Sequence, residues 1–203
     1  MSLLAAQPEI APGRKRPDRE IRREQIFEQA IRLFSQYGYN GFGIQELAEN
    51  CGLTKAGLLY HVGSKDQLLT ELLEHRDRRD KEAIAAILGV PPGQNHRAGH
   101  PVDVLHAIVA HKATQPEYIR LYEVLQGEAL DRSHPASEFF LRRQAEAIDE
   151  TAQLVAPYVA DPQATARAVV ALISGLMQQW LREDQGFDLV AACDRAIAAL
   201  APR

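Results

Sequence analysis

The chain has 203 residues, of which 46% are hydrophobic and 25% are charged, and its formal net charge is −4. This composition is typical of a globular protein with a substantial core, and no apolar run approaches the roughly 18 residues that would cross a membrane. The N-terminal charges follow a weak apolar patch, which is the reverse of a secretion signal, so we expect a cytoplasmic protein with no membrane partner.

Residues 1–18 are expected to form a disordered basic arm, because they contain prolines and lack apolar periodicity. A basic cluster begins in this arm and continues beyond it; its members are Arg14, Lys15, Arg16, Arg19, Arg22 and Arg23. Such clusters occur both in solvated tails and in arms that bind nucleic acid, and the sequence leaves both readings open.

Two helices are predicted after the arm. The first runs from Arg19 and carries an apolar stripe made of Ile26, Phe27, Ala30, Ile31 and Phe34. The turn sequence "YGYNG" at residues 37–41 ends it. The second helix is short, and its apolar face consists of Ile44, Leu47, Ala48 and Cys51.

A third and a fourth helix follow, each with a residue suited to cap its start. Thr54 is a good N-cap for a helix that ends near Val62. Ser64 and Gln67 have the spacing of a capping box at the start of the fourth helix, which could extend to Leu88.

The rest of the chain is predicted to be helical after a break rich in glycine and proline at residues 89–101. The expected segments lie near 102–114, 116–130, 136–158, 162–183 and 187–200. No useful strand pattern appears. We therefore expect an all-α fold, with a small N-terminal unit at residues 19–66 and a larger C-terminal helical bundle at residues 67–203.

The second and third helices have the pattern of a helix-turn-helix. Ala48 supplies the small side chain that two steeply crossing helices need, and Gly52 tolerates the backbone of the turn. Leu58 on the third helix can pack back onto the second. In such a motif the second of the two helices enters the major groove of DNA.

If Leu58 and Val62 face the core, the other side of the third helix faces outward. Its small first-turn residues would let the backbone approach phosphate closely, and its polar side chains could contact phosphate or base edges. The candidate DNA-contacting residues are Thr54, Lys55, Ala56, Gly57, Tyr60, His61 and Lys65. The alternative is that Tyr60 or His61 simply packs on the first helix.

Two stretches, "IFEQAIRLFSQYGYNGF" at 26–42 and "GIQELAENCGLTKAGLLYHVGSKDQLL" at 43–69, closely resemble the signature of the tetracycline-repressor (TetR) family of transcriptional regulators. The resemblance implies that residues 19–66 bind DNA and that residues 67–203 bind a ligand and dimerise. It also implies a palindromic double-stranded operator and a homodimer, without separating repressor from activator.

The second part of the chain offers independent hints of a dimer interface. Small residues recur at helical spacing at Ala164, Ala168, Ala171 and Gly175, and residues 187–201 are similarly alanine-rich. Such stripes allow close helix approach, which suits a four-helix bundle across a two-fold axis. Ordinary packing within one chain is the alternative.

A pocket for a small organic effector, uncharged or weakly polar, is also expected, because ligand sites are mostly apolar with a few polar groups. Its candidate residues are His106, Tyr118, Tyr122, Phe139, Phe140, Arg143, Met177, Gln178 and Trp180, each of which could instead belong to the core. The resemblance implies a population shift, in which the ligand favours a dimer whose DNA-reading helices are wrongly spaced for the operator. The fourth helix would transmit this change, because it joins the DNA-binding unit to the ligand-binding unit.

Two other functions are compatible with parts of the sequence. A helical enzyme could use His106 or His111 with Asp103, but no nucleophile motif, phosphate loop or cofactor fingerprint appears, so we expect neither catalysis nor a cofactor. A ligand-binding module without DNA-reading activity is the second alternative. His96 and His100 share metal-like spacing but lack further ligands, and we expect no metal site.

Overall fold

The computed structural model describes residues 15–90 and 99–200, and these ranges contain only helices, which confirms the predicted all-α fold. The helices are α1 (Lys15–Tyr37), α2 (Ile44–Asn50), α3 (Lys55–Val62), α4 (Lys65–Ile87), α5 (Pro101–Ala113), α6 (Pro116–Glu128), α7 (Ser137–Val155), α8 (Pro162–Arg182) and α9 (Leu189–Leu200). Within these ranges, no helix combines the length and the apolar character that crossing a membrane requires.

The observed boundaries agree closely with those expected from periodicity and punctuation, with one clear exception at the N-terminus. Helix α1 begins at Lys15, so residues 15–18 are helical and the prediction that the arm is disordered as far as residue 18 is wrong there. Pro17 falls in the first turn of this helix, where proline is tolerated because the first amides of a helix have no intrahelical partner. The remainder of the predicted arm, residues 1–14, lies outside the described residues.

The two predicted caps are present in the structure, at the starts of α3 and α4. The Thr54 hydroxyl accepts a hydrogen bond of 3.1 Å from the Gly57 amide, and the Ser64 hydroxyl accepts one of 3.1 Å from the Gln67 amide. Gly63, which separates the two helices, has φ +71°, a left-handed conformation that glycine adopts without strain. The chain therefore turns sharply from α3 into α4.

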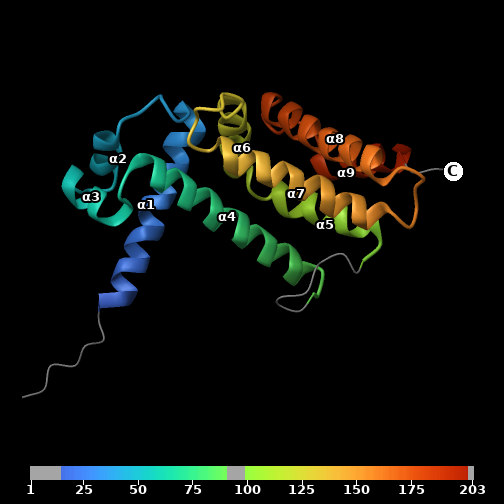
Figure 1. Cartoon of the computed structure of the whole chain (residues 1–203), viewed down its shortest axis with the longest axis horizontal. Coiled ribbons are helices and arrows are strands. Elements are labelled where there is room, and N and C mark those ends of the chain that lie inside the picture. Colours follow the sequence, from blue (N-terminus) through green and yellow to red (C-terminus); the bar gives the residue numbers. More distant parts are fainter. Residues whose placement is uncertain (1–14, 91–98, 201–203) are drawn as a thin grey trace, which may run out of the picture.

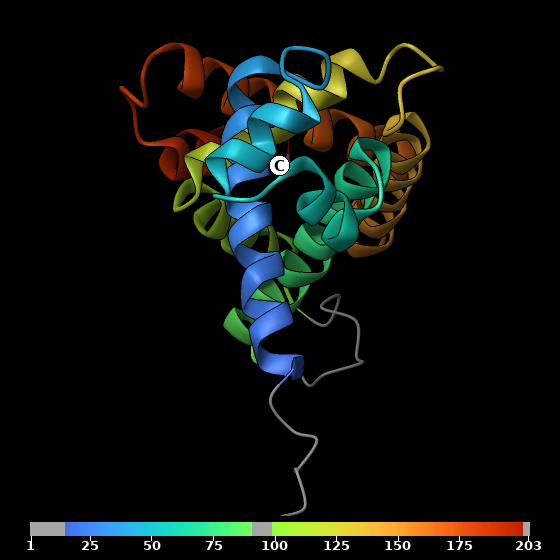
Figure 2. The same ribbon diagram turned by 90° about the vertical axis from the view of Figure 1, so that its left-hand side faces the viewer.

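Helices α1 to α3 form one end of the molecule, and α4 runs from that end along the bundle formed by α5 to α9 (Figure 1). Helices α7 and α8 pack side by side, and α9 packs against both α5 and α8. Figure 2 views the molecule from the side of α1 to α3, where α2 and α3 lie outermost. Helix α6 packs against α1, so the bundle also supports the first three helices.

The apolar core is shared between the two predicted units. One cluster joins buried residues of α1 to α4 with the end of α6 and the start of α7; its members from the bundle include Leu121, Leu125, Phe139 and Phe140. A second cluster lies between α5, α8 and α9. The predicted boundary at residue 66 falls inside the unbroken helix α4, within its first turn.

Candidate functional site

The helix-turn-helix is built around three side chains that water does not reach. Ala48 on α2 and Leu58 on α3 are fully buried, and Val62 is 3% exposed. Gly52 has φ +64° in the turn, and the Leu53 amide donates a 2.8 Å hydrogen bond to the Ala48 carbonyl, which closes it. Helix α3 is thereby fixed with one face in the core and the opposite face outward.

The outward face of α3 carries the candidate DNA-contacting residues. Thr54, Lys55 and Ala56 are exposed at its first turn, and the Tyr60 side chain is 74% exposed. Gly57 and His61 are half-buried; within the described residues, Nδ1 of His61 has no hydrogen-bond partner. The structure thus brings together six of the seven candidates as one surface; Lys65 is placed differently.

Lys65 points into the junction between α1 and α2. Its ammonium donates hydrogen bonds to the carbonyls of Tyr39 and Phe42 and lies 3.9 Å from the centre of the Phe42 ring. Burial lowers the pKa of Lys65 despite nearby carboxylates. In this DNA-free structure Lys65 therefore stabilises the turn that supports α2, and its predicted phosphate contact stays a prediction.

Arg19 joins this surface, although the list of contact candidates drawn from the sequence did not include it. Its guanidinium lies 5.8 Å from the centre of the Tyr60 ring, so the exposed start of α1 adds positive charge beside α3. The available signal was the basic cluster, which on sequence alone could not be separated from a solvated tail.

The other end of the α1–α2 turn is tied to the bundle. The Tyr39 amide donates a 2.8 Å hydrogen bond to Glu128 Oε2 at the end of α6. The Tyr39 hydroxyl donates to Asp66, and burial together with that carboxylate raises the pKa of Tyr39 to about 12. The buried ring of His134 lies with its Nε2 3.7 Å from Glu128. The DNA-binding end and the bundle therefore meet through polar contacts as well as a shared core.

A cavity of about 210 Å³ lies between α4, α5, α6, α7 and α8. Of the nine pocket candidates, four line it: Tyr118, Tyr122, Arg143 and Met177. The other five lie elsewhere. Phe139 and Phe140 belong to the core beneath the DNA-binding end, and Trp180 belongs to the core between α5, α8 and α9. His106 binds Asp194, and Gln178 donates a 2.7 Å hydrogen bond to Glu123, which itself lines the cavity.

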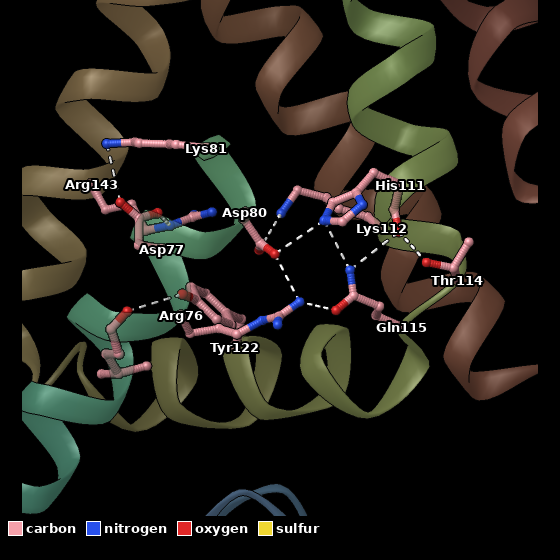
Figure 3. Close-up of polar contacts among 11 residues, drawn as sticks. Arg76, Asp77, Asp80, Lys81, His111, Lys112, Thr114, Gln115, Tyr122 and Arg143 are labelled. Atoms are coloured by element: carbon pink, nitrogen blue, oxygen red, sulfur yellow. Dashed lines mark hydrogen bonds and ion pairs between the residues drawn. The ribbon is translucent and has the colours of Figure 1, made fainter. Parts of the chain in front are cut away.

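The wall formed by α4 is strongly charged (Figure 3). Arg76 and Asp80, one turn apart, form an ion pair of 2.8 Å with only 11% and 10% of their side chains exposed. His111 Nε2 lies 3.2 Å from the same Asp80 oxygen, and Gln115 accepts a hydrogen bond from Arg76. The Arg76 guanidinium also stacks 3.5 Å from the centre of the Tyr118 ring, so that ring is held by a cation rather than free.

A second charged group links α4 to α7. Arg143 Nε and Lys81 Nζ lie 3.0 Å and 3.1 Å from the two oxygens of Asp77. Burial alone would raise the pKa of Asp77, but these cations more than offset it and hold that pKa below its ordinary value. Arg143 also lies 4.6 Å from the centre of the Tyr122 ring. Two of the predicted pocket residues therefore belong to one ionic network.

The lining is more apolar than polar, as expected, but the expectation that it contains few polar groups is wrong. The cavity-lining residues include four cationic and five carboxylate side chains: Arg76, Lys81, Lys112 and Arg143, with Asp77, Asp80, Glu123, Glu146 and Glu150. In the sequence, the charged residues of α4 look like solvent-facing positions. In the structure they face a cavity that α5 to α8 enclose. Only the tertiary arrangement shows this.

The small-residue stripe of α8 faces outward. Ala164, Ala168 and Ala171 are exposed in the single chain, and a methyl group added at Gly175 would meet nothing within 4 Å. The interface prediction therefore stays a prediction, on a face that is open in this chain.

Asp103, the carboxylate named for the enzyme alternative, pairs with neither histidine within the described residues, although His111 contacts Asp80. His106 Nδ1 lies 2.9 Å from Asp194 on α9, and Asp103 is not its partner. In the same part of the chain, no group of three or more His, Cys, Asp or Glu side chains could hold a metal ion. His100 is the N-cap residue of α5, and His96 lies outside the described residues.

Comparisons with known proteins place this geometry in a family. The family model described as bacterial regulatory proteins, tetR family, matches residues 26–72. The transcriptional regulator AcrR of Shigella flexneri is 26% identical over 181 residues, which cover 82% of this chain and 81% of AcrR. The repressor AcnR of Corynebacterium jeikeium is 35% identical over 69 residues, which cover 34% of this chain and 36% of AcnR.

Among solved structures, AibR in complex with isovaleryl coenzyme A and operator DNA is similar in fold, with a TM-score of 0.65, 21% identity, and coverage of 89% of this chain and 98% of that one. The family model describes regulatory proteins, and both AcrR and AcnR are transcriptional regulators of the helix-turn-helix type. Residues 26–72 thus match the tetR family model, and most of the chain is similar to the regulator AcrR.

Proposed function

We propose that the protein is a homodimeric repressor that binds a palindromic operator in the cytoplasm and leaves it when a small organic molecule occupies the cavity. The observation that carries the proposal is the path of α4. This single helix begins at the Ser64 cap beside α3 and then lines the cavity with Arg76, Asp77, Asp80, Lys81 and Ile84. A shift of α4 caused by ligand would therefore move the base of the recognition helix.

The DNA contact is assigned to the outward face of α3. Thr54, Lys55 and Ala56 present backbone amides and one cation at the start of the helix, where the dipole favours phosphate. Tyr60 and Arg19 extend the surface toward the start of α1. The overall charge of −4 does not oppose this, because affinity for DNA depends on where the cations lie.

The dimer is assigned to α8 and α9. Two copies of α3 must be about one helical turn of DNA apart to read two half-sites, so a two-fold contact is needed. Ala164, Ala168 and Ala171 are exposed in the single chain, and α8, which carries them, lies on the opposite side of the bundle from α4 (Figure 1). Small side chains there would let the helices of two copies approach closely.

The operator is found by selecting bound duplexes from a random DNA pool at low and moderate salt without ligand. An enriched inverted repeat is the expected result, and weak binding that disappears as salt rises would contradict the proposal. The selected duplex then becomes the probe in fluorescence anisotropy. We expect Lys55→Ala to weaken binding roughly tenfold, while Lys81→Ala in the cavity leaves ligand-free binding unchanged.

The dimer is tested by sedimentation equilibrium on a matched pair of variants. Ala168→Glu places a charge in the proposed interface and should give a monomer, because an uncompensated charge in a helix contact is strongly unfavourable. Ala145→Glu makes the same change at an exposed position of α7 and should leave the dimer intact. A dimer that survives Ala168→Glu would exclude this face.

A further inference from the structure

The cavity has two different walls. One is aliphatic and comes mainly from α5 and α8; its members include Val104, Leu105, Ile108, Ile173 and Met177. The facing wall, from α4 with parts of α5 and α7, is charged (Figure 3). A ligand that fills this space is therefore expected to be amphipathic, with an aliphatic body and one charged end. The sign of that end follows from how the wall charges pair.

Three of the carboxylates on the charged wall already have close cations. Asp77 lies within 3.1 Å of Arg143 and Lys81, and Lys81 is also 3.1 Å from Glu146. Asp80 holds Arg76 at 2.8 Å. Asp77, Asp80 and Glu146 thus have cations close by, so a ligand would gain little by replacing these pairs, although Nε of Arg76 has no hydrogen-bond partner within the described residues.

Lys112 is the cation left without a close partner on this wall. Its single ion pair among the described residues is with Asp80 Oδ2 at 4.0 Å, and its ammonium makes no hydrogen bond there. The side chain lines the cavity and keeps 23% of its surface accessible. An ammonium group has three donors, and a buried charge without hydrogen bonds is costly. Lys112 is thus placed to receive an anion from the cavity.

On this basis we propose that the effector is an aliphatic organic anion whose carboxylate binds the Lys112 ammonium and whose hydrocarbon body lies against α5 and α8. The inference rests on the proposed function, since it names the chemistry of the molecule that would release the repressor. The carboxylate would add one negative charge beside Lys112, where Arg76 and Arg143 lie together with Asp77 and Asp80, and it would supply hydrogen-bond acceptors to the Lys112 ammonium.

A cationic ligand is the competing chemistry, and Glu123 is the group that it would use. Glu123 has no ion pair within 4.0 Å among the described residues, but it accepts a 2.7 Å hydrogen bond from Gln178. Burial also raises the pKa of Glu123, which favours its neutral form. Glu123 is therefore better satisfied without a ligand than Lys112 is.

The test uses three probes with the same eight-carbon body and different ends: octanoate, octylamine and octan-1-ol. Isothermal titration calorimetry on the full chain at pH 7 is expected to show octanoate binding at least roughly tenfold more tightly than either of the others. Equal affinity for all three, tighter binding of octylamine, or no binding of any probe would overturn the inference.

Two lysine variants separate Lys112 from the general charge of the cavity. Lys112→Met keeps the length and apolar stem of the side chain but removes its charge, and should weaken octanoate roughly tenfold or more while leaving octan-1-ol unchanged. Lys81→Met removes a lysine that already has two carboxylate partners and should change octanoate affinity by less than about threefold. An equal loss in both variants would overturn the assignment to Lys112.

Proton uptake gives a readout that does not depend on a variant folding. Burial, with repulsion from Arg143, lowers the pKa of Lys112 to about 8, so part of the free protein carries an uncharged amine at that pH. The titratable and charged groups around Lys112 are Arg76, Asp77, Asp80, Tyr122, Glu123 and Arg143. His111, which precedes Lys112 in the chain, contacts the same Asp80. A bound carboxylate favours the ammonium, so octanoate should bind with net proton uptake at pH 8, measured in buffers of different ionisation heat.

The same coupling predicts that octanoate affinity falls roughly tenfold between pH 7 and pH 9, as the free protein loses the Lys112 proton. Octanoate binding without proton uptake at pH 8 would overturn the inference. Failure of the proposed function looks different, because it would appear as no selected operator whatever the probes do. Preferential binding of octylamine with release from the operator would keep the repressor and reject the anion.

Discussion

Helix α4 buries leucines along its first half and charged side chains along its second. Leu68, Leu69 and Leu72 are fully buried under the DNA-binding end, whereas Arg76 and Asp80 are buried beside the cavity. Apolar packing is stabilising whether or not a ligand is present. Buried charges depend closely on their partners, so a molecule that enters the cavity can change their energy. The first half of α4 therefore supports α3 by apolar packing, and the energy of its second half depends on the charges around the cavity.

One of the two largest expected effects is at the charged end of α4. Asp80→Asn removes the carboxylate partner of buried Arg76 and should lower the free energy of unfolding by about 3 kcal/mol. The double variant Arg76→Met/Asp80→Leu replaces the pair with apolar groups and should recover part of that loss, because His111 and Lys112 still lose their contact with Asp80. Urea unfolding measures both. A loss below about 1 kcal/mol for Asp80→Asn would show that this pair is not energetically buried.

A comparable loss of about 2–5 kcal/mol is expected from Leu58→Ala at the apolar end, because Leu58 is fully buried between α2 and α3 and the truncation leaves a cavity. The matched change Leu130→Ala, at a leucine that is 84% exposed, should change stability by less than about 0.5 kcal/mol. The loss in Asp80→Asn can be reduced by also replacing its charged partner, whereas the loss in Leu58→Ala has no charged partner to replace. Similar urea midpoints for the two alanine variants would contradict this account.

A smaller effect on stability is expected at Lys65, a charged residue at the start of the apolar half of α4. Lys65→Met removes the hydrogen bonds to the Tyr39 and Phe42 carbonyls and should cost about 1 kcal/mol of stability. Lys55→Met, on the exposed face of α3, should leave the unfolding free energy unchanged while weakening operator binding. If Lys65→Met weakens only DNA binding and keeps full stability, Lys65 acts on phosphate and not on the turn.

The smallest expected effect concerns pH. Burial lowers the pKa values of His75 and His134, so the folded protein holds their protons less tightly than the unfolded chain does. Stability from these groups is fully present above about pH 6.5 and is lost as pH falls through that value toward their folded pKa values. His134→Asn should flatten the profile measured by urea unfolding between pH 7.5 and 5.5. An unchanged slope would mean that His134 titrates alike in both states.

Much of the DNA-binding end could be predicted from the sequence because its determinants are local. The caps Thr54 and Ser64, the glycines at 52 and 63, and the apolar face of α3 all act within a few residues of one another. Distant contacts were not accessible in this way. Lys65 has the position of a phosphate contact, yet its ammonium binds carbonyls that lie 23 and 26 residues earlier.

The cavity could be predicted only in part, for the same reason. Aromatic residues in helices suggest either core or pocket, and the choice depends on which helix packs opposite. Tyr118 and Tyr122 line the cavity, whereas Phe139 and Phe140 fill the core shared with α1 to α4. Lys112 had no signal at all, because an isolated lysine near a helix end reads as surface and its surroundings come from three other helices.

The core shared between α1 to α4 and the ends of α6 and α7 limits how this molecule can be recombined. Leu121, Leu125, Phe139 and Phe140 lie on the bundle side of that core, so a cut at residue 66 would divide a hydrophobic cluster and break the Tyr39–Glu128 hydrogen bond. A hybrid protein that joins helices α1–α3 to a different helical bundle must therefore retain those four side chains. In this protein the transplantable unit is defined by a surface and not by a point in the chain.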